Sequence, residues 1–149
     1  MRKLLLCFFI AVPCLAFGPQ VFAQTARELQ TLLATDAVSY GQAASFVLRA
    51  ADITEQGDAF EYAAGQNWLP VEAEKDAPAK LDGVSLLVMR AFGMKGGAFY
   101  TMMKTPHYAY RELVRQNIIQ GRADSDMAVS GDLLLFIINR VLELQEGNQ

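Results

Sequence analysis

Few side chains in this sequence are of a type that could carry out catalysis. His107 is the only histidine, and it would need a nucleophile or a second acid nearby to act as a general base, for which the sequence has no motif. Asp124 and Asp126 have the spacing of calcium ligands, but the glycine and glutamate of an EF-hand loop are missing, so we expect a solvated turn. These residues predict no catalytic side chain, no metal site and no cofactor.

Residues 1–23 have the layout of a secretory signal peptide. Arg2 and Lys3 precede an unbroken apolar run over residues 4–12, and the segment ends at the small residue Ala23. The apolar run is shorter than the roughly 20 residues that a membrane helix needs. We therefore expect cleavage near Ala23 and a mature chain of residues 24–149 that forms one domain.

Both cysteines, Cys7 and Cys14, lie within this signal segment. A bacterial lipoprotein would be lipidated at Cys14, but the preceding Val12-Pro13 differs from the small residues usual at that place. We therefore favour ordinary cleavage over lipidation. The mature chain then has no disulfide, no thiol nucleophile and no cysteine metal site.

Composition narrows the class of protein further. The chain is 52% hydrophobic and 19% charged, which is typical of a folded domain. Loss of the signal removes Arg2 and Lys3 but no acid, so the net charge goes from −3 to −5, which argues against nucleic-acid binding. The longest later apolar run, residues 133–138, is too short to span a membrane. We expect an exported protein of the periplasm or cell envelope.

Helical periodicity dominates the mature chain. Residues suited to helix N-caps stand before five apolar stripes, at Thr25, Ser39, Asp82, Thr105 and Ser130 or Asp132. Thr25 and Ser39 have capping-box spacing to a glutamate or glutamine, and Thr105 precedes a proline. The expected inward residues are Leu29, Leu32 and Leu33; Ala43, Phe46, Val47 and Ala50; Val84, Leu87, Val88 and Ala91; and Leu134, Ile137, Ile138 and Val141.

An internal repeat relates two parts of the chain. Residues 59–69 align with residues 109–119, and each unit consists of a helix, an asparagine, an apolar pair, a turn and a second helix. The asparagines, Asn67 and Asn117, predict a left-handed residue just past the end of each first helix. Residues 38–50 form a weaker third copy, in which Arg49 takes the position of Arg90 and Arg140.

The unit that starts at residue 109 resembles the S-layer homology family. Its residues Ala109-Tyr110-x-x-Leu113-x-x-x-Asn117-Ile118-Ile119-Gln120-Gly121-x-x-Asp124 follow the family's first helix and turns. The middle unit matches moderately and the first unit poorly. The resemblance implies a mainly α bundle of helix pairs, from two clear units and one weak unit, with very short extended segments. It also implies non-covalent attachment to a cell-wall polysaccharide.

One feature of that family is missing. Its binding arginine opens the second helix, where this chain has Ser39-Tyr40-Gly41, Asp82-Gly83 and Ser130-Gly131-Asp132 instead. The guanidinium groups that would recognise an anionic glycan in bidentate fashion are therefore absent. The resemblance carries over the scaffold but not the wall-polymer site.

The segment over residues 92–110 departs from the family's compact unit. It contains three glycines, then aromatic and methionine side chains of the kind that adaptable contact surfaces use. The segment is either a connector that plugs the bundle or a surface for a ligand or partner. The candidate surface residues are Phe99, Tyr100, Met102, Met103, His107 and Tyr108.

Two other features have ordinary structural interpretations. Trp68, the only tryptophan, is expected in the core rather than on an exposed sugar-stacking platform. Arg111, Glu112 and Arg115 are expected to form a solvated polar face on the helix after Thr105.

Taken together, the sequence favours an exported, non-catalytic module of the cell envelope. Its role would be binding or structural, with a cell-wall glycan or another envelope protein as partner. One alternative is a small periplasmic hydrolase, which would need two carboxyl groups facing one pocket. The other is a carrier of an apolar ligand, which would need an internal cavity of a few hundred Å³.

Overall fold

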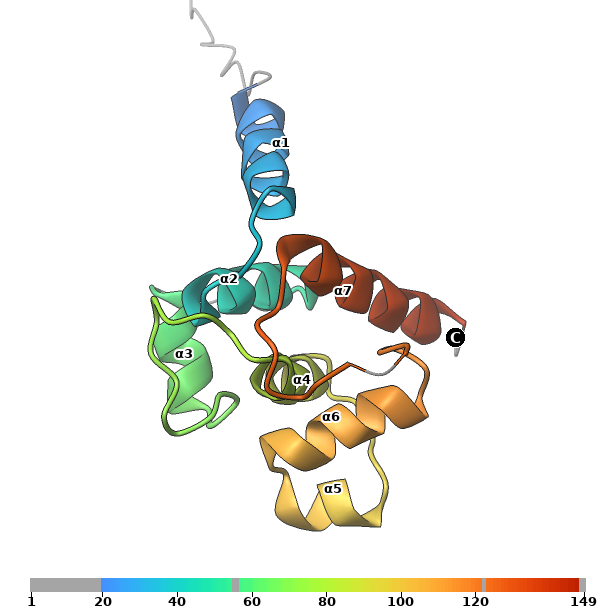
Figure 1. Cartoon of the computed structure of the whole chain (residues 1–149). Coiled ribbons are helices and arrows are strands. Elements are labelled where there is room, and N and C mark those ends of the chain that lie inside the picture. The colour runs from blue at the N-terminus through green and yellow to red at the C-terminus, as the bar shows by residue number, and fades with distance from the viewer. Residues whose placement is uncertain (1–19, 55–56, 122, 148–149) are drawn as a thin grey trace, which may run out of the picture.

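The computed structural model describes residues 20–54, 57–121 and 123–147, and these are mainly helical (Figure 1). Most of the expected signal peptide, residues 1–19, lies outside the described residues, so the signal stays a prediction. The mainly α prediction is confirmed: apart from two isolated β-bridges, the regular elements are helices. They are α1 (Gln20–Leu33), α2 (Tyr40–Ala50), α3 (Ala59–Gly65), α4 (Leu81–Ala91), α5 (Ala98–Met103), α6 (Pro106–Arg115) and α7 (Gly131–Glu146).

Three of the predicted helix starts are confirmed. Ser39 is the N-cap of α2 and forms the expected capping box, in which its hydroxyl accepts from the N–H of Gln42 while the Gln42 side chain accepts from the N–H of Ser39. Thr105 is the N-cap of α6 with a proline as its first helical residue, and Ser130 is the N-cap of α7. Ser39 makes side-chain cap hydrogen bonds, whereas Thr105 and Ser130 share only its extended backbone and make none.

Two predicted starts are wrong. The N-cap of α4 is Lys80, so Asp82 lies in the first turn of that helix, where a carboxylate still suits the helix dipole. Helix α1 begins at Gln20, so Thr25 is inside it rather than before it. Of the leucine stripe predicted for α1 only Leu32 is buried, because most of α1 extends away from the rest of the molecule (Figure 1). The exposed stripe residues are Leu29 and Leu33.

The predicted left-handed asparagines are confirmed. Asn67 and Asn117 each have a φ of 56° directly after a first helix. The next residue donates its N–H five residues back, from Trp68 to Ala63 and from Ile118 to Leu113, each at 2.9 Å. Asp52 and Gly93 have the same conformation after α2 and α4, with φ values of 56° and 59°. The same type of helix C-terminus, with a left-handed residue after the last turn, therefore recurs along the chain.

Three short extended segments meet in a closed ring of hydrogen bonds. The N–H of Val38 donates to the carbonyl of Val129 (2.8 Å), Val129 donates to Ala79 (2.9 Å), and Ala79 donates back to Val38 (2.8 Å). All three residues are fully buried, and each stands directly before the N-cap of α2, α4 or α7. Because the ring is cyclic, each of the three segments before α2, α4 and α7 is bonded to both of the others.

A second ring of hydrogen bonds joins the same three units, with its donors running in the opposite direction around the ring. The N–H groups at the starts of α2, α4 and α7 donate to carbonyls of the next unit, from Tyr40 to Ala77 (3.1 Å), from Leu81 to Met127 (3.0 Å) and from Gly131 to Thr35 (2.9 Å). The otherwise unpaired donors of each helix start are thus satisfied across a unit boundary. The last unit closes onto the segment that follows α1.

The core is built around α4. This helix is buried on nearly every side and packs most extensively against α6, with α2 against its other side. The predicted inward residues Val84, Leu87 and Val88 are fully buried, and so are nearly all of those predicted for α7. Trp68 is half-buried against the core, with its ring edge-on to Tyr62 at 5.8 Å between centroids.

Candidate functional site

The connector between α4 and α6 carries α5 at the end of the molecule opposite α1 (Figure 1). Glycines define its course. Gly93 ends α4 in the left-handed conformation, and a Cβ on Gly96 would lie 2.4 Å from the ring of Tyr100. The N–H of Gly97 donates to a carboxylate oxygen of Glu112 at 3.0 Å. These contacts fix α5 against α6 instead of leaving it as a free loop.

Glu112 corrects the expectation of a wholly solvated polar face on α6. It is only 7% exposed, and besides Gly97 its carboxylate accepts from Arg115 Nε at 2.7 Å and from Gln116 Nε2 at 3.2 Å. Burial acts to raise the pKa of Glu112, but the hydrogen bonds from Arg115 and Gly97 outweigh it and hold the pKa below its usual value. The sequence signal was present, since Glu112 stands three residues after Ala109 on the buried stripe.

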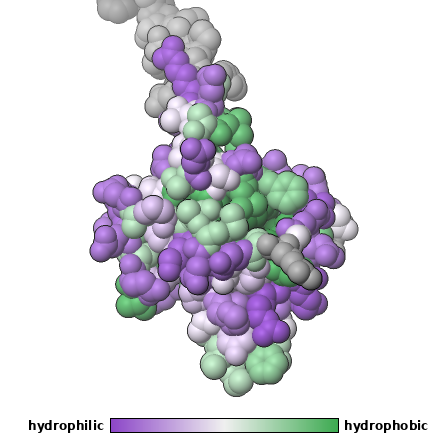
Figure 2. All heavy atoms as spheres, viewed as in Figure 1, coloured by the Kyte–Doolittle hydropathy of each residue, from purple (hydrophilic) through white to green (hydrophobic). Residues whose placement is uncertain are grey.

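The predicted surface residues separate into an exposed group and a buried one. Phe99, Met102 and Met103 are 66%, 76% and 54% exposed on α5, and Figure 2 shows apolar surface at this tip. Tyr100, on the same helix, is 6% exposed and faces inward, contrary to the expectation. Burial raises its pKa, with opposing influences from the nearby charges of Arg90 and Glu112. A six-residue helix can expose only part of its circumference, and Tyr100 is on the part that packs.

His107 and Tyr108 lie beside this exposed group. The ring of Tyr108 stacks on Phe99 with 5.9 Å between centroids and 12° between planes, and His107 is exposed with its edge toward Tyr108. Among the described residues, no hydrogen bond or ion pair links His107 to a carboxylate or a hydroxyl. The arrangement therefore gives His107 none of the partners that a general base uses.

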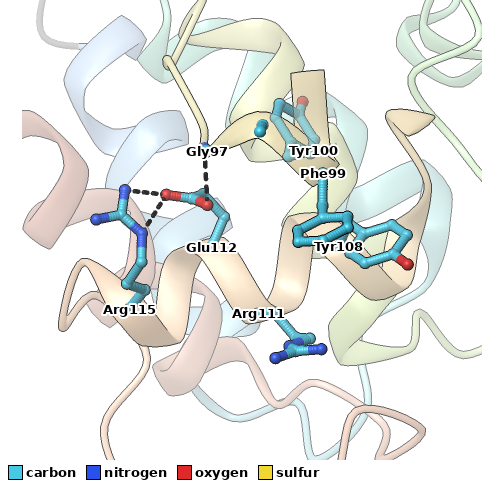
Figure 3. Close-up of a pocket in the computed structure, with 8 residues that line it drawn as sticks. Gly97, Phe99, Tyr100, Tyr108, Arg111, Glu112 and Arg115 are labelled. Carbon is cyan, nitrogen blue, oxygen red and sulfur yellow. Dashed lines mark hydrogen bonds and ion pairs between the residues drawn. The ribbon is translucent and has the colours of Figure 1, made fainter. Parts of the chain in front are cut away.

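A pocket of about 370 Å³ opens between α5 and α6 (Figure 3). The stacked rings of Phe99 and Tyr108 form one side, and the ion pair of Glu112 with Arg115 forms the other. Arg111 lines the rim and points away from Glu112, with no ion pair to any described residue (Figure 3). The pocket thus combines an aromatic face with the cationic side chain of Arg111. The sequence analysis did not name Arg111 as a site residue, because it assigned this side chain to a solvated face.

Asp82, Asp124 and Asp126 each have a hydrogen-bond partner. Asp82 accepts from the N–H of Gly83 at 2.7 Å, and burial raises its pKa. The carboxylate of Asp126 accepts a hydrogen bond from the ammonium group of Lys80 at 3.4 Å. The carboxylate of Asp124 accepts from the N–H of Asp126 within the turn. Within the described part of the chain, no group of three or more metal-ligating side chains comes together.

Comparison with protein-family models, curated proteins and solved structures found no match to this chain. None of the described helices has both the length and the apolar character needed to cross a membrane.

Proposed function

We propose that this protein is an exported, non-catalytic module of the cell envelope that binds another protein through α5. The observation that carries this proposal is the exposure of Phe99, Met102 and Met103 on one six-residue helix. Large apolar side chains gathered at one place favour a contact surface, and methionine adapts well to a partner's shape. The three-way hydrogen-bond ring supports a scaffold role, because it holds the helices without any catalytic arrangement.

The surroundings of α5 indicate what the partner looks like. Lys104 follows the helix and Arg111 lies on the neighbouring α6, so cationic groups flank the apolar side chains. A complementary partner has an apolar groove with acidic residues at its rim. The hydrogen bond between Gly97 and Glu112 keeps α5 ordered before binding, which lowers the entropic cost of association.

A cell-wall glycan is the second candidate partner. It is favoured by the pocket of about 370 Å³, where the stacked Phe99 and Tyr108 rings stand near Arg111. An aromatic face beside a polar group suits a sugar ring, and the resemblance to S-layer homology units points to the same ligand class. The two candidates share Phe99 but differ in whether Met102 is needed.

The test is a pull-down with the mature protein against envelope extracts and, in parallel, cell-wall sacculi. We expect wild type to retain a discrete protein from the extract and the double variant Phe99→Ser/Met102→Ser to lose it. Val71→Ser is the matched control, since Val71 is fully exposed in a turn outside the α4–α6 segment.

The outcomes separate the candidates. Equal retention by all three proteins contradicts a role for α5. Retention on sacculi that is lost with Tyr108→Ala but kept with Met102→Ser favours the glycan instead.

A further inference from the structure

The three arginines at matching repeat positions have different surroundings. Arg49 pairs with Glu28 at 2.9 Å, and Arg140 pairs with Glu143 at 2.7 Å. Arg90 pairs with no carboxylate of the described residues. The Nε atoms of Arg90 and Arg140 are both buried without a hydrogen-bond partner. A guanidinium with an unused buried donor is costly unless something accepts from it. What distinguishes Arg90 from the other two is the lack of a carboxylate partner among the described residues.

Arg90 lines a groove of about 390 Å³ together with Lys95 and Lys104. No acidic side chain lines this groove, although the whole chain has a net charge of −3. Three cations beside one hollow produce a positive potential that attracts an anion. The groove is also lined by Thr101, whose hydroxyl donates to the carbonyls of Gly96 and Gly97, and by the half-buried side chain of Met94.

The backbone at Lys104 is a second, independent sign. Lys104 ends α5 with a φ of 47°, in the left-handed region. The other left-handed positions of the described chain are taken by asparagine, aspartate or glycine, which tolerate that conformation. The left-handed backbone at Lys104 costs conformational free energy, and such strain often accompanies a functional position.

We propose that this groove binds a small organic anion through its phosphate or carboxylate group. Arg90 donates to the anion through the terminal NH2 groups of its guanidinium, Lys95 and Lys104 add positive charge, and Met94 contacts the uncharged part. The groove is a different hollow from the pocket beside Phe99, although Tyr100 borders both. The inference goes beyond the proposed protein contact and would stand if α5 bound no partner.

The test uses isothermal titration calorimetry and NMR shift mapping with three probes: glucose 6-phosphate, inorganic phosphate and glucose. We expect glucose 6-phosphate to bind and to shift the amide signals of residues 93–97, and glucose not to bind. Arg90→Gln should weaken binding by about 10- to 100-fold, as expected for loss of charge-assisted hydrogen bonds. Arg49→Gln is the matched control, because it changes the equivalent but already paired arginine, and it should bind like wild type.

A second variant keeps the test independent of folding. Lys104→Gly removes the charge and suits the left-handed backbone, so it should fold at least as well as wild type and bind several-fold more weakly. If inorganic phosphate competes equally with glucose 6-phosphate, the groove recognises the anionic group alone; weaker competition shows that the organic part contributes. The proposal is overturned if neither anion binds, if glucose binds as tightly, or if Arg90→Gln and Arg49→Gln behave alike.

Discussion

At the scale of single residues, the described structure gives Glu112 a different role from the one its residue type suggests. A glutamate on a helix between two arginines is expected to form a solvated ion pair that stabilises the fold by only a few tenths of a kcal/mol. Here the carboxylate is buried and accepts from the backbone of the connector as well as from α6. The side chain therefore ties α5 to α6 and does more than solubilise the helix.

Replacement of this carboxylate should weaken the fold. We expect Glu112→Gln to lower the free energy of unfolding by about 1 to 3 kcal/mol, because charged hydrogen bonds to Gly97 and Arg115 become neutral or are lost. Urea denaturation followed by circular dichroism measures this. Arg111→Gln, on the same helix but without an ion pair among the described residues, should change stability by less than about 0.5 kcal/mol. Equal effects would show that Glu112 has no special role.

The stability difference between wild type and Glu112→Gln should also depend on pH. The folded-state pKa of Glu112 is lowered, so the unfolded chain takes up its proton first as the pH falls. The contribution is therefore complete above the unfolded-state pKa of about 4.3 and is lost as the pH falls through the lower folded-state pKa. Unfolding curves from pH 7 downward should show the two proteins converging in acid. A constant difference over that range would contradict this assignment.

At the scale of elements, the helices end by a shared mechanism. Five of them, α2 to α6, are followed by a left-handed residue, and asparagine fills that position at Asn67 and Asn117. The local sequence predicts these ends because a left-handed backbone is tolerated by few residue types. The exposed face of α1 was not predictable in this way, since a leucine stripe does not say whether anything packs against it.

A substitution series at Asn117 tests this mechanism. Asn117→Ala should lower the free energy of unfolding by about 1 kcal/mol, because a Cβ-bearing residue without a short polar side chain disfavours the left-handed region. Asn117→Gly should be neutral or slightly stabilising for the same reason. Thermal unfolding compares the three proteins. A loss with glycine as large as with alanine would indicate that the asparagine side chain, not the backbone, is what matters.

At the scale of the whole molecule, three units are joined by a ring of buried backbone hydrogen bonds at Val38, Ala79 and Val129. The ring closes only when the last unit meets the chain that follows α1. Gly131 lies at this closure, where an added Cβ would stand 1.8 Å from the carbonyl oxygen of Leu32. No side chain fits there without displacement of α1 or α7.

Gly131→Ala should therefore open the junction between α1 and α7. We expect a loss of about 1 to 3 kcal/mol, as for other overpacked sites, with faster hydrogen exchange at Thr35 and Gly131. Gly65→Ala is the control, since nothing lies within 4 Å of its added Cβ. Similar stability of both variants, with unchanged exchange at the junction, would argue against a closed ring in solution.

The sequence by itself determined the starts of α2, α6 and α7 and the ends of α3 and α6, because caps and left-handed residues act within a few positions of the chain. It also indicated the repeat, but it left open whether the segment that contains α5 plugs the bundle or forms a surface. The tertiary structure alone decided that Glu112 and Tyr100 are buried, that Leu29 and Leu33 are exposed, and that Arg90 stands unpaired beside Lys95 and Lys104. Burial and pairing depend on which surfaces of distant segments meet, and no local pattern encodes that choice.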